Sequence, residues 1–416
     1  MPSTLERAPS RREFAGVLAG AGLWLGGGAA SAETPPPPAK LPDPMVWAPR
    51  ELENLIASPK DAINVFDFEP VARKNLPPAH FGYLVAGVDD EVTLRANREG
   101  FLKFQLRPRR LVDVSKIDLS THILGTRYDT PIFICPTASN RAFHPDGELA
   151  VAKAARAGNH LQMLSTVATT SIEEATAARG APIWFQLYAS PKWEIAEALV
   201  KRAERAGCPA IVVTLDDLGG RNQETLLRLR RADTRQCASC HAPGWGYVAR
   251  KPNYDGLDMS GVSTVLAPNM TWDFIKRLRD TVGSKLVLKG IMSHEDARLA
   301  AASGIDAIIV SNHGGRSEDS GRSSIDALPE IIEAAGGNMP VLIDSGFRRG
   351  TDIVKALAMG AKGVGIGRAA LWGLGAFGQE GVERVLELLR SELRIAMQQL
   401  GAPSIQHLQP EMVRRA

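Results

Sequence analysis

The stretch Ala307-Ile-Ile-Val-Ser-Asn-His-Gly-Gly-Arg316 decides how the rest of the chain is interpreted. Its four apolar residues, mostly β-branched, predict a strand buried on both faces, as in a parallel sheet. Ser311, Asn312 and His313 follow, and two glycines then allow the backbone to turn. His313 and Arg316 therefore follow the C-terminal end of a strand, where α/β barrels carry out their chemistry. Histidine is a suitable general base near neutral pH, and arginine binds a carboxylate through two parallel hydrogen bonds.

A histidine at one strand end is more often structural than catalytic, so the remaining strands matter. Strand–helix alternation repeated eight times predicts a (β/α)8 TIM barrel, with a doubly wound open sheet as the alternative. Alanine-rich segments with amphipathic spacing, such as Glu194–Ala206, separate most of the strands. The strands are expected at residues 131–138, 161–166, 183–188, 210–216, 285–290, 307–313, 341–346 and 363–368.

Three segments outside this alternation carry their own patterns. Residues 51–110 show helical patterning with a break at Pro77-Pro78, which predicts an N-terminal helical segment covering one end of the barrel. The connection after the fourth strand, residues 222–270, is far longer than a usual barrel loop and is a candidate lid or accessory element. Residues 380–400 predict a long closing helix.

Composition narrows the class of protein. The chain has 416 residues, 44% of them hydrophobic, and a formal charge of +3 from 49 basic and 46 acidic side chains. This charge is nearly balanced and no broad basic run is present, so we expect no nucleic-acid partner. Four cysteines in a chain of this length do not form a disulfide scaffold. Cys135 and Cys208 fall in or beside core elements and are expected to be buried.

The N-terminus has the pattern of an export signal. Arg11-Arg12 precedes an apolar, Gly/Ala-rich stretch at residues 15–30, and Ala30-Ser31-Ala32 offers a small-residue cleavage site. This pattern predicts a twin-arginine signal peptide over residues 1–32 and a periplasmic protein, with a membrane anchor as the alternative. Residues 33–50 are a Pro-rich linker, and residues 51–416 form the barrel domain.

The predicted strand ends suggest a phosphate-bearing cofactor. Asp344-Ser345-Gly346 with Arg348 ends the seventh strand, and Gly365-Ile-Gly-Arg368 ends the eighth, which is where such barrels bind phosphate. Lys289 ends the fifth strand and needs an anionic partner at the inner mouth. A reduced flavin would supply one, and a structural ion pair with Asp216 or Asp344 is the alternative.

Several motifs, taken in order, resemble the FMN-dependent α-hydroxy acid oxidase and dehydrogenase family, which includes glycolate oxidase, lactate oxidase, mandelate dehydrogenase and the flavin domain of flavocytochrome b2. The similarity covers about residues 60–405. The motifs are Pro136-Thr-Ala138, His144-Pro-Asp-Gly-Glu148, Phe185-Gln-Leu-Tyr188, Lys289-Gly290, Ser311-Asn-His-Gly-Gly-Arg316, Asp344-Ser-Gly-Phe-Arg-Arg-Gly-Thr-Asp352 and Gly365-Ile-Gly-Arg368.

The resemblance implies the catalytic roles. His313 would take a proton from the substrate, Asp216 would orient the imidazole, and Tyr188 would hydrogen-bond the reacting oxygen. Three residues would bind the substrate carboxylate: Tyr83, Arg221 and Arg316. FMN would be held by Pro136, Thr137, Ala138, Ser165, Gln186, Thr214, Lys289, Ser311, Asp344, Gly346, Arg348, Gly367 and Arg368. The family also implies a homo-oligomer, with a tetramer favoured.

The chain departs from the family pattern near the substrate. The family's Thr-x-Asp-Thr-Pro-x-x-Gly-x-Arg is shortened here to Thr214-Leu-Asp-Asp-Leu-Gly-Gly-Arg221, so the position of Arg221 is inferred across a gap. Val167 stands where some members carry an active-site tryptophan, and Ser139-Asn140 where others carry larger residues. These positions shape the substrate pocket, so the identity of the 2-hydroxy acid stays open.

Cys237-Ala-Ser-Cys240-His241, inside the long connection, has the spacing of a c-type haem attachment site. Haem at Cys237, Cys240 and His241 would carry single electrons away from the flavin, and Met259 and Met270 are candidate second axial ligands. A Cys237–Cys240 disulfide, free thiols or another metal site are the alternatives. Apart from this haem iron we expect no metal.

These observations predict an exported FMN-dependent dehydrogenase of small, lactate-like (S)-2-hydroxy acids. It would form the 2-oxo acid and pass electrons to a cytochrome or quinone-linked respiratory carrier. The alternatives are an oxidase that forms H2O2 without haem and a catalytically silent FMN or haem electron-transfer protein. The presence of His313, Asp216 and Arg316 argues against the silent protein, because it would not need them.

Overall fold

The structure is a computed structural model and describes residues 55–235, 244–262 and 264–416. The expected signal peptide (residues 1–32), the Pro-rich linker (33–50) and the motif formed by Cys237, Cys240 and His241 lie outside the described residues. None of the helices within the described ranges is long and apolar enough to cross a membrane.

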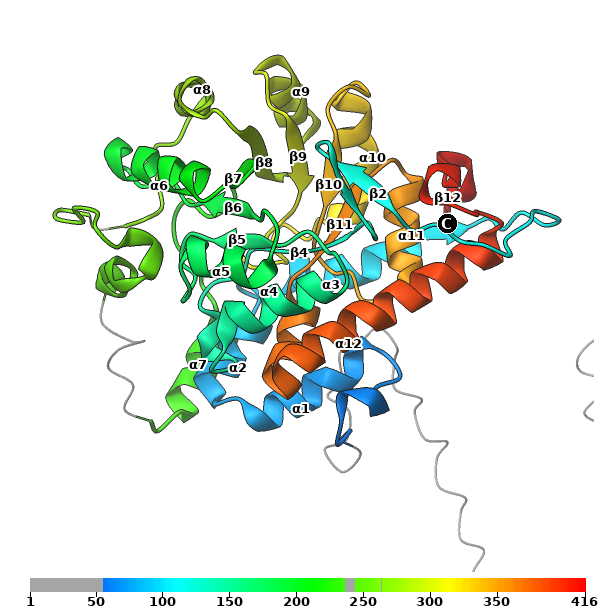
Figure 1. Ribbon diagram of the computed structural model, residues 1–416, viewed down its shortest axis with the longest axis horizontal. Helices are drawn as coiled ribbons and strands as arrows, with labels where there is room; N and C mark the ends of the chain where they lie inside the picture. The colour runs from blue at the N-terminus through cyan, green and yellow to red at the C-terminus, as the bar shows by residue number, and fades with distance from the viewer. Residues whose placement is uncertain (1–54, 236–243, 263) are drawn as a thin grey trace, which may run out of the picture. The chain divides into compact units, whose positions relative to one another are not determined.

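Eight parallel strands form a closed barrel, as the sequence predicts (Figure 1). Neighbouring strands follow the order β4-β11-β10-β9-β8-β7-β6-β5, and a parallel bridge between Ile134 and Gln162 joins β4 to the residue before β5. Most of the strands end earlier than predicted because the polar residues after them already belong to the loops. The strands are β4 (Ile132–Ile134), β5 (Met163–Ser165), β6 (Trp184–Leu187), β7 (Ala210–Thr214), β8 (Lys285–Ile291), β9 (Ala307–Val310), β10 (Val341–Ile343) and β11 (Gly363–Ile366).

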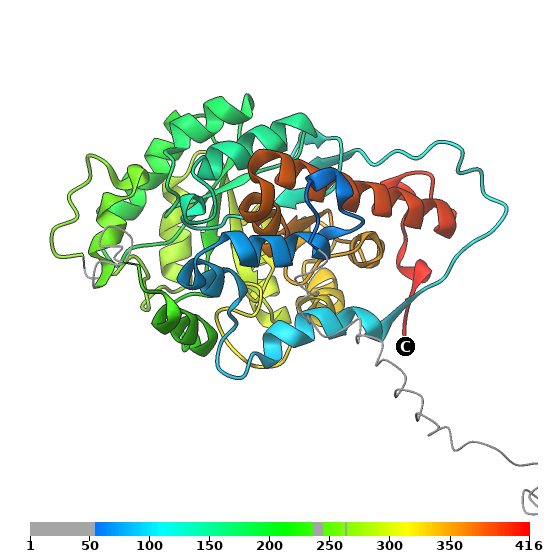
Figure 2. The ribbon, with the colours of Figure 1, turned by 90° about the horizontal axis from the view of Figure 1, so that it is seen from below.

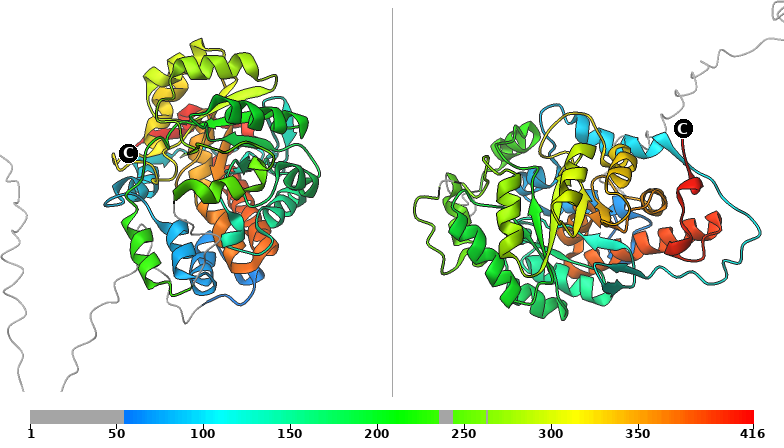
Figure 3. Two further views of the ribbon diagram at one scale, coloured as in Figure 1. Left: turned by 90° about the vertical axis from the view of Figure 1, so that its left-hand side faces the viewer. Right: turned by 90° about the horizontal axis from the view of Figure 1, so that it is seen from above.

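Helices follow the strands and form the outer layer of the barrel (Figures 1 and 3). In three of them a serine side chain, from Ser171, Ser293 or Ser323, accepts the N–H of the third helical residue and so fixes where the helix begins. The helices are α4 (Gly147–Ala157), α5 (Ile172–Arg179), α6 (Trp193–Arg205), α8 (Trp272–Thr281), α9 (His294–Ala302), α10 (Ser324–Ala334), α11 (Gly350–Ala358) and α12 (Arg368–Leu400).

The closing helix α12 is longer than predicted. It begins at Arg368, directly after β11, and bends at Phe377 and Gly378, where the backbone leaves helical dihedral angles. The glycine-rich first half hides the helical periodicity from the sequence. Two of its glycines are needed for close packing, since a Cβ added to Gly381 would lie 2.0 Å from the carbonyl oxygen of Gly373.

The N-terminal segment is helical, as predicted, and packs against elements far along the chain. It comprises η3 (Pro59–Asp61), η4 (Val65–Asp67), α1 (Phe68–Asn75), α2 (Pro78–Val85), α3 (Val92–Glu99) and η5 (Gly100–Lys103). Helix α1 packs against α12, and α2 packs against α7 (Glu224–Ala232) from the long connection (Figure 2). The α2–α7 contact is close, because a Cβ on Gly82 would lie 2.9 Å from the Cβ of Leu229.

Two strand pairs were not foreseen from the sequence. Strand β1 (Phe104–Leu106) pairs antiparallel with β12 (Val413–Arg415) near the C-terminus. Strands β2 (Thr121–Ile123) and β3 (Thr126–Tyr128) form a hairpin just before the barrel begins. Ile123 and Tyr128 of this hairpin join the core cluster that contains Phe133, Trp184 and Val287 from the barrel strands. The hairpin therefore closes the N-terminal end of the barrel.

The described part of the long connection is an accessory element fastened to the barrel mouth. After α7 it continues through η7 (Gly244–Arg250) and η8 (Pro252–Tyr254). The buried Asn253 side chain donates to the carbonyl oxygens of Ser165 and Thr166 and accepts the N–H of Ile172. The Lys251 ammonium donates to the Ser139 hydroxyl at 2.7 Å.

Replacing Ile123 by alanine tests the closing role of the hairpin. Ile123 is 1% exposed, and its loss removes buried apolar surface and leaves a cavity. We expect Ile123→Ala to lower the free energy of unfolding by about 2–5 kcal/mol, measured by chemical denaturation. The matched control Ile395→Ala, at a position that is 55% exposed, should change it by less than about 0.5 kcal/mol. Equal effects of the two substitutions would contradict the role of the hairpin.

Candidate active site

The C-terminal ends of the barrel strands and helix α2 surround a pocket of about 780 Å³, part of which is open to solvent. Most of the predicted site residues line it: Tyr83, Pro136, Thr137, Ala138, Tyr188, Lys289, His313, Arg316, Asp344, Gly346, Arg348, Gly367 and Arg368. The barrel thus brings together residues that the sequence spreads over almost 300 positions.

His313 has an unusual backbone conformation at this mouth. Its φ is +58°, in the left-handed region, and Gly314 and Gly315 continue in that region with φ of +73° and +71°. A Cβ on Gly315 would lie 2.6 Å from the backbone of Leu94, so only glycine fits there. Three successive left-handed residues turn the chain sharply out of β9. This turn directs the imidazole into the pocket.

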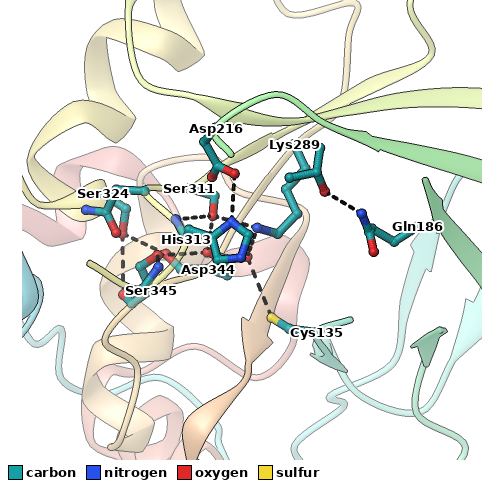
Figure 4. Close-up of polar contacts among 12 residues, drawn as sticks. Cys135, Gln186, Asp216, Lys289, Ser311, His313, Ser324, Asp344 and Ser345 are labelled. Atoms are coloured by element: carbon teal, nitrogen blue, oxygen red, sulfur yellow. Dashed lines mark hydrogen bonds and ion pairs between the residues drawn. The ribbon is translucent and has the colours of Figure 1, made fainter. Parts of the chain in front are cut away.

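His313 and Asp216 form a hydrogen-bonded pair across the mouth. The two atoms Nδ1 of His313 and Oδ1 of Asp216 are 2.7 Å apart (Figure 4). The Tyr188 hydroxyl lies 3.3 Å from Nε2 of His313. Burial lowers the pKa of His313 to about 4, although Asp216 opposes this shift. The imidazole is therefore neutral at pH 7, with Nδ1–H donating to Asp216 and Nε2 able to accept a proton.

Tyr188 stays protonated in this setting. Burial raises the pKa of its hydroxyl, and the Asp216 carboxylate acts in the same direction. A protonated phenol donates a hydrogen bond, and Nε2 of the neutral His313 is an acceptor within reach. The phenol and the imidazole can therefore both hydrogen-bond to one oxygen of a bound molecule.

A buried ionic network lies behind His313. The ammonium of Lys289 is 3.5 Å from Asp344 Oδ2 and donates to the Ser311 hydroxyl at 3.0 Å (Figure 4). Ser311 and Ser345 both donate to Asp344 Oδ1, at 2.6 and 2.8 Å. The Cys135 thiol lies 3.6 Å from Asp344 Oδ2. The ion pair that the sequence left as an alternative for Lys289 is therefore present, with Asp344 as the partner.

Lys289 keeps its charge despite burial. Burial disfavours the ammonium form, but the carboxylates of Asp344 and Asp216 outweigh this effect and raise its pKa. For Asp216, burial likewise favours the neutral form, and His313 and Lys289 outweigh it and lower the pKa. The inner mouth thus holds fixed charges of both signs next to a neutral base.

One hydrogen-bond donor of Arg316 is available to a ligand. Its Nη1 donates to the carbonyl oxygens of Tyr83 and Ala86 at 2.7 and 3.0 Å, and its guanidinium stacks on the Tyr83 ring, 4.7 Å from the centroid. Nη2 is shielded from solvent and finds no hydrogen-bond partner among the described residues. A buried cationic donor in a pocket requires an anion, and a carboxylate satisfies its geometry.

The Arg221 side chain is bound by Asp217, a residue to which the sequence analysis gave no role. It forms two hydrogen bonds to Asp217 and does not line the pocket. Its charge nevertheless contributes to lowering the pKa values of His313 and Arg316.

Two further buried arginines form a cationic end of the pocket. Burial first, and then neighbouring arginines, lower the pKa of Arg348 well below its usual range and that of Arg368 to about 9. A Cβ on Gly367 would find its nearest neighbours 3.9 and 4.0 Å away, so the backbone there is open to a ligand. A phosphate dianion would relieve the repulsion between the guanidinium groups. The residues present therefore fit FMN: Arg348 and Arg368 would hold its phosphate, and Lys289 would bind its ring.

Some predicted cofactor residues lie behind the pocket wall. Ser165, Gln186, Thr214 and Ser311 do not line it, and Gln186 donates to the Thr214 hydroxyl at 2.9 Å. Sequence reasoning assigned no role to seven other lining residues, of which four lie inside the quoted motifs, two come from helices and one precedes a motif by one position. These are Leu84, Cys135, Gly314, Ser345, Phe347, Gly365 and Leu371. Cys135, directly before Pro136, and Gly314, directly after His313, could have been found from their neighbours.

Comparisons with known proteins agree with this geometry. The family model described as FMN-dependent dehydrogenase matches residues 72–415. The chain is 41% identical to an L-lactate oxidase from a Nostoc species, covering 85% of this chain and 97% of that protein. It is 39% identical to glycolate oxidase 1 of Zea mays, covering 82% and 93%. A soluble mutant of the membrane-associated (S)-mandelate dehydrogenase from Pseudomonas putida superimposes with a TM-score of 0.78 at 36% identity, covering 86% and 100%.

The protonation of His313 can be measured directly. In flavin-free protein we expect its imidazole to titrate with a pKa near 4, followed by NMR of labelled histidine. Because the Asp216 carboxylate raises this pKa, Asp216→Asn should lower it further, so that the neutral form persists to still lower pH. A His313 pKa at or above 6.5, or a pKa that rises in Asp216→Asn, would contradict this account of the pair.

Proposed function

The chain belongs to the family of FMN-dependent 2-hydroxy acid oxidases and dehydrogenases, and on that premise we propose that it oxidises a small, lactate-like (S)-2-hydroxy acid to the 2-oxo acid at His313. One observation carries the assignment of this site. Arg316, whose Nη2 is shielded and has no hydrogen-bond partner among the described residues, lines the same pocket as the neutral imidazole of His313, which is paired with the Asp216 carboxylate. A 2-hydroxy acid offers a carboxylate to the first and a removable proton to the second.

Each polar group then has a defined task. Arg316, together with Arg221, binds the substrate carboxylate and orients the carbon that carries the hydroxyl. Nε2 of His313 takes a proton from the substrate, and Asp216 stabilises the imidazolium that forms. The Tyr188 hydroxyl hydrogen-bonds the reacting oxygen. FMN, when bound, accepts the two electrons that the substrate loses.

The residues proposed to hold FMN divide into two groups. Backbone at Pro136, Thr137 and Ala138, with the Lys289 ammonium, would hold the ring, and the second-layer side chains Ser165, Gln186, Thr214 and Ser311 would support these contacts. The ribityl chain and phosphate would be held by Asp344, Gly346, Arg348, Gly367 and Arg368. The depressed pKa values of Arg348 and Arg368 support this placement, because an anion between them would restore their usual values.

A small substrate is supported by the residues around the mouth. The Tyr83 ring packs against Phe143, with centroids 6.3 Å apart and an interplanar angle of 26°, which limits space beside Arg316. The relative that is 41% identical is named an L-lactate oxidase, which agrees with a lactate-like substrate.

For the electron acceptor we propose a cytochrome or quinone-linked carrier in the periplasm, reached through haem at Cys237, Cys240 and His241. The paired arginines at 11 and 12 and the small-residue site at 30–32 support twin-arginine export, and covalent haem attachment takes place outside the bacterial cytoplasm. The candidate axial ligands Met259 and Met270 both pack against the main core. An H2O2-forming oxidase is the second candidate, favoured by the names of two relatives, glycolate oxidase and L-lactate oxidase.

The base can be removed without disturbing the rest of the pocket. We expect His313→Gln to retain FMN. Reduction of the flavin by L-lactate or glycolate should be at least about 100-fold slower, because glutamine offers no base in place of Nε2 to take the proton. The rate is measured by anaerobic stopped-flow absorbance. His294→Gln, at a histidine whose side chain is 42% exposed, is the matched control and should leave the rate unchanged. Full-rate reduction in His313→Gln would end the assignment.

The acceptor is tested on protein recovered from the periplasmic fraction. The proposal predicts haem absorbance that resists acid-acetone extraction and disappears in Cys237→Ser/Cys240→Ser. It also predicts slow reoxidation by O2 compared with a cytochrome or quinone analogue. Flavin without haem, together with stoichiometric H2O2, would instead establish the oxidase.

A further inference from the structure

Asp217 and Arg221 form an ion pair at the edge of the mouth. Arg221 Nε donates to Asp217 Oδ1 at 2.9 Å, and Nη2 donates to Oδ2. The Arg221 side chain is 17% exposed and the Asp217 side chain is 7% exposed. The pair is therefore largely shielded from water, and dissolved salt screens it only weakly. Both acceptor oxygens of one carboxylate thus face one side of the guanidinium.

The loop that carries this pair is anchored at its two ends. At the β7 end, the N–H of Leu215 donates to the carbonyl oxygen of Lys289 at 2.8 Å, and Asp216 binds His313. At the other end, Asn222 exchanges two hydrogen bonds with Asp89, each 2.9 Å long.

The middle of the loop lacks such support. Leu218, Gly219 and Gly220 are exposed, and a Cβ added to either glycine would meet nothing within 4 Å. Two adjacent glycines also leave the backbone broad conformational freedom. The ion pair with Asp217 is therefore the described side-chain contact that determines where the Arg221 guanidinium points.

Only one edge of the Arg221 guanidinium is hydrogen-bonded within the described residues. Asp217 occupies the Nε–Nη2 edge, and no hydrogen bond from Nη1 is found among the described residues. A guanidinium binds carboxylates along either edge in a fixed plane, so a second carboxylate can use the Nη1–Nη2 end. Arg221 also acts electrostatically on Tyr188, His313 and Arg316, the residues that surround the proposed substrate position.

We propose that Asp217 is a positioning residue for substrate binding, which holds Arg221 by one edge so that its other edge meets the substrate carboxylate opposite Arg316. This inference rests on the proposed 2-hydroxy acid site. Asp217 stands where the family pattern has threonine, in a loop that is shorter than the family's. A shorter loop with two glycines presents the arginine from a different point, and the carboxylate compensates by fixing its direction.

The effect on anion binding of removing the Asp217 charge should depend on whether Arg221 is present. With Arg221 present, the carboxylate is paired and orients the cation, so its loss weakens anion binding. With Arg221 removed, the same buried carboxylate is an unpaired negative charge beside an anion site, so its loss strengthens anion binding. The sign of the effect should therefore reverse between the two backgrounds, which a merely structural contact would not produce.

The experiment measures oxalate binding to oxidised, FMN-loaded protein by perturbation of the flavin absorbance, in a double-mutant cycle. We expect Asp217→Asn to raise the Kd about tenfold, because hydrogen bonds to charged groups contribute on this scale. Arg221→Ala should raise it further, and Asp217→Asn/Arg221→Ala should bind oxalate more tightly than Arg221→Ala alone. In turnover with the preferred 2-hydroxy acid, Asp217→Asn should raise KM with less than about a twofold change in kcat.

Two controls separate positioning from loop damage. Leu218→Ala alters an exposed neighbour in the loop and should leave the Kd unchanged. Asp217→Glu keeps the charge and should recover part of the affinity that Asp217→Asn loses. FMN content should stay at the wild-type value in all variants, which shows that each variant is folded under the conditions of the assay.

An unchanged or lower Kd in Asp217→Asn, or effects of the same sign in both backgrounds, would overturn the inference while leaving the proposed function standing. Failure of the proposed function looks different. In that case no 2-hydroxy acid reduces the wild-type flavin and oxalate does not perturb its spectrum, and both proposals fall.

Discussion

The buried charge of Lys289 is the constraint on which the mouth of the barrel depends. An ammonium at this depth is stable only beside carboxylates, and Asp344 and Asp216 raise its pKa against the effect of burial. Asp344 is held in turn by Ser311 and Ser345. The Lys289 ammonium in turn helps burial to lower the pKa of His313 and keep it neutral, whereas Asp216 acts on His313 in the opposite direction. The base and the cation of the site are therefore two consequences of one electrostatic arrangement.

The parallel barrel makes this arrangement possible because it brings all the strand ends to one rim. His313 and Asp216 are 97 residues apart in sequence, yet they follow β9 and β7 and meet at hydrogen-bond distance. Helices α1 and α2 add a second layer from the N-terminal segment, which brings Tyr83 over Arg316. Rigid strands hold the charged groups, so little reorganisation is needed when a ligand enters.

The arginines in and beside the pocket differ in their surroundings. Arg348 and Arg368 are crowded together at one end, where their pKa values fall. Arg316 lies close to Arg368, since both donate to the carbonyl oxygen of Ala86, and one Arg316 donor has no partner among the described residues. The charge of Arg221 is partly neutralised by Asp217.

The sequence by itself determined the eight strands, the helices between them and the polar residues at each strand end, because alternation and β-branched runs are local signals. Only the tertiary structure decided which groups meet. The β2–β3 hairpin closes the barrel through Ile123, and helix α12 extends back to Arg368 through glycine contacts with no local signature. The partner of Arg221 could not be predicted either. The shortened loop indicated a different position for Arg221, but it did not indicate which carboxylate would orient the side chain. Such contacts depend on packing between distant segments, and no local pattern encodes them.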